Sequence, residues 1–345
     1  MVTIEDIAKE AGVSTTTVSN VIHGRTNKVS AATVDLINEI IQRRGYVPNL
    51  SARALKIRSS RLVALISRMD ANRRDRFWSD PFSISLTGAV EQALRENGYF
   101  LMVRAISEPE ELLAFLRNWN VEGVFLPGLF EDDPLYKTVC DLKMPVVLTD
   151  SYLSNPGAMV NIGLQDLEGA RIATDYLISK GHRRIVFAGP GVKSGGVVEH
   201  RLLGYRQALE AAGIAFDPAL VLGCRFETDE MMKLGRQIAE LSDVTAVFAT
   251  ADLLAAGIMA GLQQSGKRIP EDISVVGFDD INWSRMTNPM LTTVRQDADE
   301  KGRLAAQYMI SLLEGKMPEK PQIVLPVQLM ERDSVRDISG SDKLL

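Results

Sequence analysis

Small polar side chains open one short predicted helix near the start of the chain. Ser14 can cap this helix, Thr15 and Thr16 follow in its first turn, and Asn20 lies on the same outward face. Threonine hydroxyls and methyls and an asparagine amide can all meet base edges in the major groove of DNA. The residue types and their spacing therefore predict a helix that contacts base pairs.

Three predicted helices would position these side chains. Thr3 can cap the first helix, with Asp6 in the capping-box position, and Gly12 breaks it before Ser14 begins the second. A third helix is expected from Ser30 to Gly45. A plain helical hairpin with a polar outer face would show a similar pattern. The third helix and the segment that follows it favour a DNA-binding headpiece instead.

Basic residues gather in the same part of the chain. Nine lysine or arginine and five acidic residues occur up to Arg61, a net charge of +4, whereas the whole chain carries −5. The 30 basic and 39 acidic residues that follow give a net charge of −9. No acidic residue lies between Glu39 and Asp70. This distribution predicts phosphate contacts and salt-dependent DNA binding by the headpiece alone.

The rest of the chain is long enough for two lobes, because 345 residues with 46% hydrophobic content extend far beyond a headpiece of about 60 residues. Short apolar runs alternate with amphipathic helical stretches, which indicates a parallel sheet covered on both faces. The predicted strands are Leu62–Ile66, Phe100–Val103, Gly123–Leu126, Val146–Leu148, Ile185–Ala188, Ala246–Ala249 and Val275–Phe278. The predicted helices are Ile84–Asn97, Leu167–Lys180, Arg201–Ala212 and Leu253–Ser265, with left-handed caps at Gly98, Gly181, Gly213 and Gly266.

Several classes of protein are disfavoured by what the sequence lacks. There is no export signal and no membrane-spanning stretch, so we expect a cytoplasmic protein without a membrane partner. Cys140 and Cys224 have no Cys-x-x-Cys partner and are predicted to be reduced. The three histidines lack His-Glu-x-x-His spacing, and no Gly-x-Ser-x-Gly motif occurs. We therefore predict no catalytic residue, no metal and no cofactor.

Three residues of the predicted body could hold a small molecule at the carboxyl ends of the strands. Asp279 follows the strand Ser-Val-Val-Gly-Phe and can accept two hydrogen bonds, while Arg201 opens a helix with a rigid fork of donors. Phe226 offers a flat face on which a ring can stack. Two other interpretations stay open: Asp279 and Arg201 could form a structural salt bridge, and Phe226 could belong to the core.

The headpiece motif Ser-Thr-Thr-Thr-Val-Ser at 14–19, with Ala-Arg-Ala-Leu-Lys at 52–56, resembles the lactose/galactose repressor family of bacterial transcription factors. The likeness spans nearly the whole chain. It implies an α/β fold with a two-lobed periplasmic-binding-protein-like body, made of parallel sheets with helices on both faces, and a small all-α helix-turn-helix N-terminal domain. The implied domains are a headpiece at 1–48, a hinge helix and linker at 49–61, and an effector-binding and dimerisation domain at 62–345. In the last domain the first lobe would span about 62–162 and 295–326, and the second about 163–294 and 327–340. The lobes would be joined by three crossings, near Asn161–Gln165, Thr293–Asp297 and Leu325–Gln328.

The resemblance also assigns DNA contacts. Leu55 would be the hinge leucine that wedges into the minor groove, with Lys56 as its flanking cation, since the cost of unstacking is offset by the extra protein surface that bent DNA contacts. Alternatively, Leu55 packs on its own protein. The implied DNA-contacting residues are Ser14, Thr15, Thr16, Thr17, Asn20, Arg53, Leu55 and Lys56. His23 stands where members often carry Asn and is expected to contact the DNA backbone or no DNA at all.

The family's effector-binding positions match Phe82, Arg201, Phe226 and Asp279. The chain departs from the family pattern at two nearby positions. Gln165 lies where members often carry Asp, and Ala251 stands where a sugar-binding member carries Asn. The effector stays open: a sugar leads because Asp and Arg around an aromatic ring suit polyol hydroxyls, and a purine comes second because Phe226 would stack equally well on a base. A sugar phosphate stays open because of Lys193 and Ser194 in the glycine-rich loop before Arg201.

The whole pattern predicts a ligand-responsive, sequence-specific regulator of transcription. We expect a repressor that binds a palindromic operator as a homodimer and is controlled by a small effector. A periplasmic-type binding protein without a regulatory role is the main alternative, although the headpiece and the missing export signal argue against it. A purely architectural DNA binder is a weaker alternative, because it would have no use for a ligand cleft.

Overall fold

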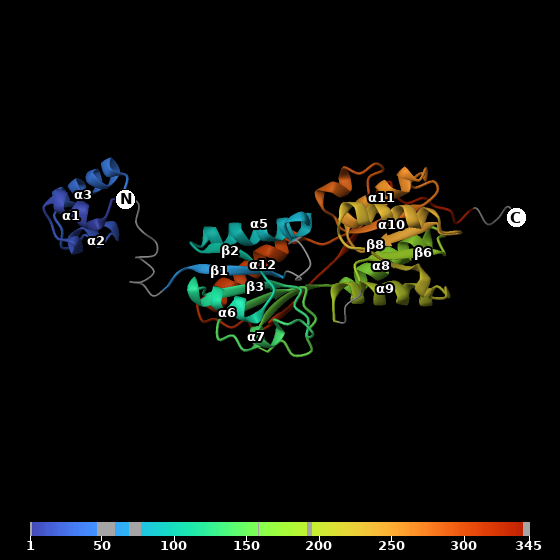
Figure 1. Ribbon diagram of the computed structural model, residues 1–345, viewed down its shortest axis with the longest axis horizontal. Coiled ribbons are helices and arrows are strands. Elements are labelled where there is room, and N and C mark those ends of the chain that lie inside the picture. Colours follow the sequence, from blue (N-terminus) through green and yellow to red (C-terminus); the bar gives the residue numbers. More distant parts are fainter. Residues whose placement is uncertain (1, 47–58, 69–76, 158, 192–194, 341–345) are drawn as a thin grey trace. The chain divides into compact units, whose positions relative to one another are not determined.

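The computed structural model describes residues 2–46, 59–68, 77–157, 159–191 and 195–340 (Figure 1). The chain divides into two compact units, Met1–Ser60 and Arg61–Leu345, which are called the headpiece and the body below. The predicted hinge residues Arg53, Leu55 and Lys56 lie outside the described residues.

Three helices form the headpiece: α1 (Ile4–Ala11), α2 (Thr15–Ile22) and α3 (Ala31–Arg44). The predicted caps are confirmed, because Thr3 and Asp6 form a capping box, and Ser14 and Ser30 each accept a hydrogen bond from the third residue beyond them. Apolar side chains from all three helices meet in one small core, made chiefly of Ile7, Ala8, Val18, Val21, Ile37 and Ile40. Local capping and one apolar stripe per helix are enough to build this unit.

The first lobe of the body is a six-stranded sheet in the order β11-β5-β4-β3-β1-β2, with every pairing parallel. Its strands are β1 (Leu62–Arg68), β2 (Phe100–Ile106), β3 (Gly123–Pro127), β4 (Val146–Thr149), β5 (Val160–Leu164) and β11 (Gln322–Leu325). Helices α5 (Pro81–Glu96) and α12 (Ala298–Leu313) cover one face, and α6 (Pro109–Asn118) and α7 (Tyr136–Cys140) cover the other (Figure 1).

The second lobe repeats this plan with the order β12-β10-β9-β8-β6-β7, in which only the pairing of β12 with β10 is antiparallel. Its strands are β6 (Ile185–Gly189), β7 (Val221–Gly223), β8 (Ala246–Ala249), β9 (Ser274–Asp279), β10 (Thr292–Arg295) and β12 (Gln328–Met330). Helices α8 (Asp166–Ser179) and α9 (Val197–Ala211) cover one face, and α10 (Thr228–Ala239) and α11 (Asp252–Gln264) cover the other. Short 3-10 turns, η1 (Phe77–Ser79), η2 (Pro218–Leu220) and η3 (Asn282–Arg285), complete the body.

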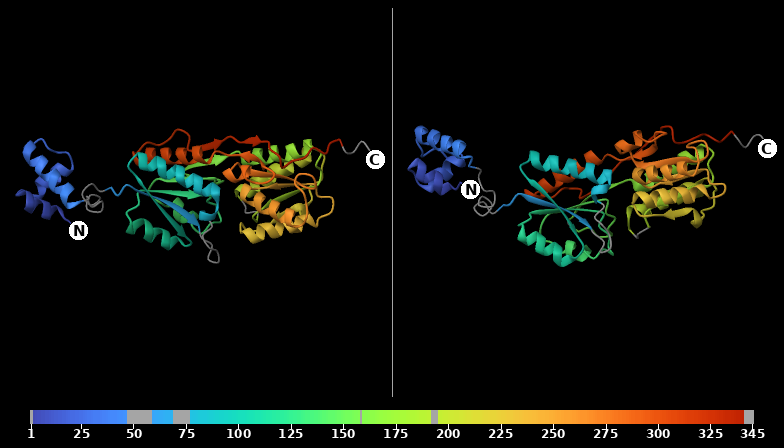
Figure 2. Two further views of the ribbon diagram at one scale, coloured as in Figure 1. Left: turned by 90° about the horizontal axis from the view of Figure 1, so that it is seen from above. Right: turned by 45° about the horizontal axis from the view of Figure 1, so that its top comes forward.

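The chain passes between the two sheets three times. It leaves the first sheet after β5, returns to the first lobe between β10 and α12, and crosses again between β11 and β12 (Figure 2). The predicted fold class is confirmed, and each of the seven predicted strands lies within an observed one. The four predicted glycine caps all have the left-handed φ expected of them. Among the described residues, no helix is both long and apolar enough to cross a membrane.

Candidate functional site

Helix α2 presents hydroxyl groups on the surface of the headpiece. Thr15 and Thr16 are both exposed in its first turn. Ser14 is occupied locally, since its Oγ accepts from the backbone N–H of Thr17 at 3.1 Å and hydrogen-bonds the Thr17 hydroxyl at 2.9 Å. Ser14 and Thr17 therefore hold the start of the helix together, and Thr15 and Thr16 offer the accessible hydroxyls.

The far end of α2 is held by its own backbone. Asn20 is partly buried, and its carbonyl oxygen accepts from the backbone N–H of Arg25 at 2.8 Å. The ring Nδ1 of His23 donates to the carbonyl oxygen of Ser19 at 2.7 Å, so that nitrogen carries the proton. His23 thus caps the helix with one nitrogen and exposes the rest of its ring.

The four predicted effector residues come together in the body. Phe82, Arg201, Phe226 and Asp279 line one cavity of about 270 Å³, called the cleft cavity below. Its lining comes from both lobes, because Phe82 lies on α5 of the first lobe and the other three lie in the second. Up to 197 positions separate these residues in the sequence, so only the folded chain brings them together.

The carboxyl ends of parallel strands position four of the polar lining residues. Asp150 follows β4, Thr250 follows β8, Asp279 ends β9 and Gln296 follows β10. In sheets of this kind, ligands bind at these ends because the loops there converge. The Thr250 Oγ1 atom is buried and has no hydrogen-bond partner within the described part of the chain. An unpaired buried hydroxyl is unusual in a folded protein, and Thr250 is one of the residues that line the cavity.

Arg201 pairs with an acidic residue that the sequence analysis missed. Its Nε and Nη2 atoms lie 2.8 Å and 2.7 Å from Asp166 Oδ1, and its guanidinium packs 3.5 Å from the ring centroid of Phe278. Both side chains are buried. The predicted alternative of an Arg201–Asp279 salt bridge is therefore wrong: Asp166 fixes the guanidinium, and Asp279 stays available at the cavity wall.

Asp279 is buried with a strained backbone. Its φ of 120° is rare for a residue other than glycine. Burial raises the pKa of its carboxyl to about 7, and the charge of Asp80 adds to the shift. The positive charge of Arg201 and a hydrogen bond from Gln296 oppose it. Asp279 is therefore poised between a carboxylate, which accepts hydrogen bonds, and an acid, which can donate one.

Lys301 and Asp150 form a second charged pair next to the cavity that was not predicted from the sequence. Lys301 is fully buried, and its Nζ lies 2.6 Å from Asp150 Oδ1 and 2.9 Å from Gln296 Oε1. Gln296 Nε2 in turn donates to Asp279 Oδ1 at 2.6 Å. In the sequence Ala-Asp-Glu-Lys-Gly-Arg, Lys301 looks like a solvated helix charge, so no local signal marked it.

Asp252 supports the same region from the start of α11. Its carboxylate accepts from the backbone N–H of Ile281 at 3.0 Å and from the Thr293 hydroxyl at 2.5 Å. It thereby ties the turn after Asp279 to β10. Burial, and secondly the charge of Asp279, raise the pKa of Asp252.

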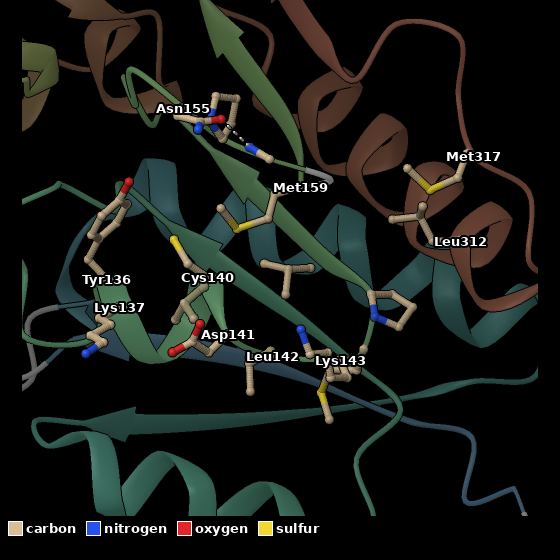
Figure 3. A pocket seen from close by; sticks show the side chains of 16 residues that line it. Tyr136, Lys137, Cys140, Asp141, Leu142, Lys143, Asn155, Met159, Leu312 and Met317 are labelled. Carbon is tan, nitrogen blue, oxygen red and sulfur yellow. Dashed lines mark hydrogen bonds between the residues drawn. The ribbon is translucent and has the colours of Figure 1, made fainter.

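A larger cavity of about 800 Å³ lies at the opposite, amino end of β4 (Figure 3). Tyr136, Cys140 and Met159 lie on one side of it, and Leu312 and Met317 on the other. None of the predicted site residues lines this cavity, and its charged residues, Lys137, Asp141 and Lys143, are all exposed. The smaller cleft cavity, with its buried arginine and carboxylates, is the better candidate for a specific polar ligand.

Neither Cys140 nor Cys224 forms a disulfide. Within the described ranges, no group of three or more His, Cys, Asp or Glu side chains is placed to hold a metal ion.

Comparisons with known proteins agree with this architecture. The model of the bacterial regulatory proteins of the lacI family matches residues 3–49, and that of the periplasmic binding protein-like domain matches residues 174–335. The HTH-type transcriptional regulator CelR of Thermobifida fusca is 36% identical over 338 residues, covering 96% of this chain and 98% of that protein. The HTH-type transcriptional repressor PurR of Vibrio atlanticus is 31% identical over 345 residues, covering 98% and 100%.

Solved structures of regulators show the same fold. A complex of the transcriptional regulator CelR with cellobiose has a TM-score of 0.72 and 33% identity, covering 97% of this chain and all of that one. The lac repressor dimer bound to operator and the anti-inducer ONPF has a TM-score of 0.81 and 25% identity, covering 97% and 99%.

A helix-turn-helix headpiece joined to a two-lobed body with a ligand cleft defines a DNA-binding regulator that responds to a small molecule. This chain belongs to the lacI family of bacterial regulatory proteins. Its relatives CelR and PurR are transcriptional regulators, in agreement with the prediction that this chain is a regulator and not an enzyme.

Proposed function

We propose that this protein is a repressor whose operator affinity is set by a neutral sugar bound in the cleft cavity. The observation that carries the proposal is the convergence of Phe82, Arg201, Phe226 and Asp279 on one cavity. Aromatic rings pack against the apolar faces of a sugar, while the arginine and carboxylate bond its hydroxyls. The relative CelR has been solved with cellobiose, and a lacI-family regulator of Enterococcus faecium with ribose, which supports a sugar here.

The proposed DNA contacts follow from the headpiece. Thr15, Thr16 and Asn20 would read base edges from α2, and Ser14 and Thr17 would hold the start of that helix. Arg53, Leu55 and Lys56, which lie outside the described residues, keep their sequence-based roles in the hinge. Sugar binding would change the angle between the lobes and so alter operator affinity, with a coupling of about 1–3 kcal/mol. The proposal places the protein in the cytoplasm, where its operator DNA lies.

One experiment on the full chain tests the proposal. Selection from random duplexes should enrich an inverted repeat that binds about 10³-fold more tightly than random DNA or better. Thermal unfolding is then followed with cellobiose, ribose, glucose, glucose 6-phosphate and guanine. A neutral sugar should raise the melting temperature and change affinity for the selected repeat. If only guanine does so, the protein is a purine-responsive regulator, and the sugar proposal is wrong.

The second part of the proposal is a dimer that matches the symmetry of the operator. The lac repressor relative is a dimer in its operator complex. In this chain, Trp283, Met286 and Met290 expose apolar surface in and after η3, with Met286 69% exposed. We assign this patch to contact with a second copy. Met286→Glu should shift the dimer toward monomer in analytical ultracentrifugation, whereas Met317→Glu, at another exposed methionine of the body, should not.

A further inference from the structure

The buried amine of Lys301 stands next to the cleft cavity without lining it. Lys301 lies in the first turn of α12, and its Nζ contacts Asp150, Gln296 and, at 5.4 Å from the centroid, the ring of Phe82. These three neighbours all line the cavity. A fully buried lysine is costly unless it is paired and hydrogen-bonded, so this arrangement needs a physical explanation.

The donors and acceptors of Lys301, Gln296 and Asp279 allow only one arrangement of the hydrogen bonds that link these three side chains. A lysine amine has only donors, whereas a glutamine amide has an acceptor at one end and donors at the other. Because Lys301 donates to Gln296 Oε1, the amide nitrogen must point the opposite way, and it donates to Asp279 Oδ1. Without Lys301 the amide could turn over and accept a hydrogen bond from a protonated Asp279 instead.

The protonation of Asp279 decides what it can bind. An N–H donated to a carboxyl group favours its charged form, which can accept hydrogen bonds from two hydroxyls. The pKa of Asp279 is raised to about 7, so the loss of one donor would change its charge near neutral pH. The groups that face it are Arg201 on α9, Asp80 before α5, Gln296 after β10, and Asp252 on α11 through both its backbone N–H and its carboxyl group.

We propose that Lys301 is a positioning residue for the effector site: it orients the Gln296 amide and thereby keeps Asp279 a hydrogen-bond acceptor for the hydroxyl groups of the effector. This inference rests on the proposed function only for the identity of the ligand. The relay itself, from Lys301 through Gln296 to Asp279, belongs to the protein and can be measured without any sugar.

The test follows the titration of Asp279 in the folded full-length chain. Urea unfolding is recorded by tryptophan fluorescence from pH 4 to 9, and Trp78, Trp119 and Trp283, the three tryptophans of the chain, all report on the body. Each background is measured with Asp279 and with Asp279→Asn. The free energy of unfolding of the protein with Asp279, minus that of the Asp279→Asn variant, should fall as the pH rises. It should level off at the folded-state pKa of Asp279, near pH 7 in the wild-type background.

The key background is the double variant Lys301→Met with Asp150→Asn. It removes one positive and one negative charge together, so it strands no buried carboxylate and leaves the net charge near Asp279 unchanged. The levelling-off point should rise by about one pH unit, because a donor to the charged carboxyl is lost. Lys316→Met, which removes an exposed lysine paired with Glu314 beyond the end of α12, should leave that point unchanged.

A third background separates the relay from simple charge effects. On Gln296→Met the double variant should cause no further shift, because the amide that transmits the effect is gone. An unchanged point in the double variant overturns the inference, and so does a shift of equal size on Gln296→Met. Neither result depends on the sugar panel, so this inference and the proposed function can fail independently.

Discussion

The headpiece and the body place their polar groups in opposite ways. On α2 the hydroxyls of Thr15 and Thr16 are exposed, and no charged side chain of the described headpiece is buried. The body instead buries Asp166, Arg201, Asp252, Asp279 and Lys301 around one cleft. A surface that binds a polyanion can leave its groups in water until DNA arrives, whereas a small polar ligand needs donors and acceptors fixed in advance. The free-energy cost of burying charged groups therefore falls on the body, and little of it falls on the headpiece.

The largest effect is expected from a substitution that breaks the buried pair between Arg201 and Asp166. Asp166→Ala should lower the free energy of unfolding of the body by about 3–5 kcal/mol, because it leaves a buried guanidinium uncompensated. Urea unfolding at pH 7.5 measures this. Glu168→Ala, on the same helix but in an exposed pair with Arg171, should cost less than about 1 kcal/mol. Equal losses would show that burial does not distinguish the two pairs.

The next effect concerns ligand affinity. Asp279→Ala should weaken binding of the active sugar by about 30-fold or more, because it removes a carboxylate that accepts hydrogen bonds from the ligand. Operator affinity without sugar should stay within about threefold, since the headpiece is a separate unit. Calorimetry and gel-shift titration measure the two quantities. Asp272→Ala, which removes a half-buried carboxylate of the same lobe that does not line the cleft cavity, serves as the control. An unchanged sugar affinity in Asp279→Ala would exclude Asp279 from the site.

A smaller effect is expected on the headpiece. Thr16→Ala should lower affinity for the selected inverted repeat by about fivefold while affinity for random DNA changes little, because base contacts are lost and phosphate contacts remain. Asn38→Ala, an exposed amide on α3, should leave both affinities unchanged. Equal loss on both DNAs would assign Thr16 to the DNA backbone. The folded fraction should not change, in contrast to the variants of the body.

The smallest effect is a pH dependence confined to the body. His182 is buried, with Nδ1 2.9 Å from the Thr245 hydroxyl and Nε2 3.1 Å from the carbonyl oxygen of Arg336. Burial lowers the pKa of His182. Its contribution to stability should therefore be complete above the unfolded pKa near 6.5 and decrease as the pH falls through the lower folded value. The difference in unfolding free energy between wild type and His182→Asn should shrink below that pH. A constant difference would mean that His182 does not titrate on unfolding.

The same contrast explains which elements were predictable. The headpiece caps at Thr3, Ser14 and Ser30 are local signals, and all three are confirmed. In the body, uninterrupted apolar runs were recognised as strands, but β5, which contains Asn161 and Gly163, was not. Its pairing with β4 and β11 on either side, rather than its composition, makes it a strand. The edge strands β11 and β12 are also short, with four and three residues, and neither has a fully buried residue.

The site was predicted in part. Asp279 ends β9, and this position could be inferred from the order of elements. Arg201 was expected to open its helix, but α9 begins four residues earlier at Val197, so Arg201 lies in the second turn. Asp166 was missed. The family resemblance placed an acidic residue at position 165, where this chain has Gln165, and the aspartate that pairs with Arg201 is the next residue along the chain. Lys301 and Gln296 could not be found in this way, because their partners are Asp150 and Asp279, which are distant in the chain.

The sequence by itself determined the headpiece helices, the alternation of strands and helices in the body, and the separation of positive from negative charge. These properties depend on neighbours within a few residues along the chain, which act the same way before and after folding. Only the tertiary structure decided which charges are paired, because pairing depends on distances across the cleft. The partner of Arg201, the orientation of Gln296 and the raised pKa of Asp279 all arise from burial and contact, which a linear pattern does not specify.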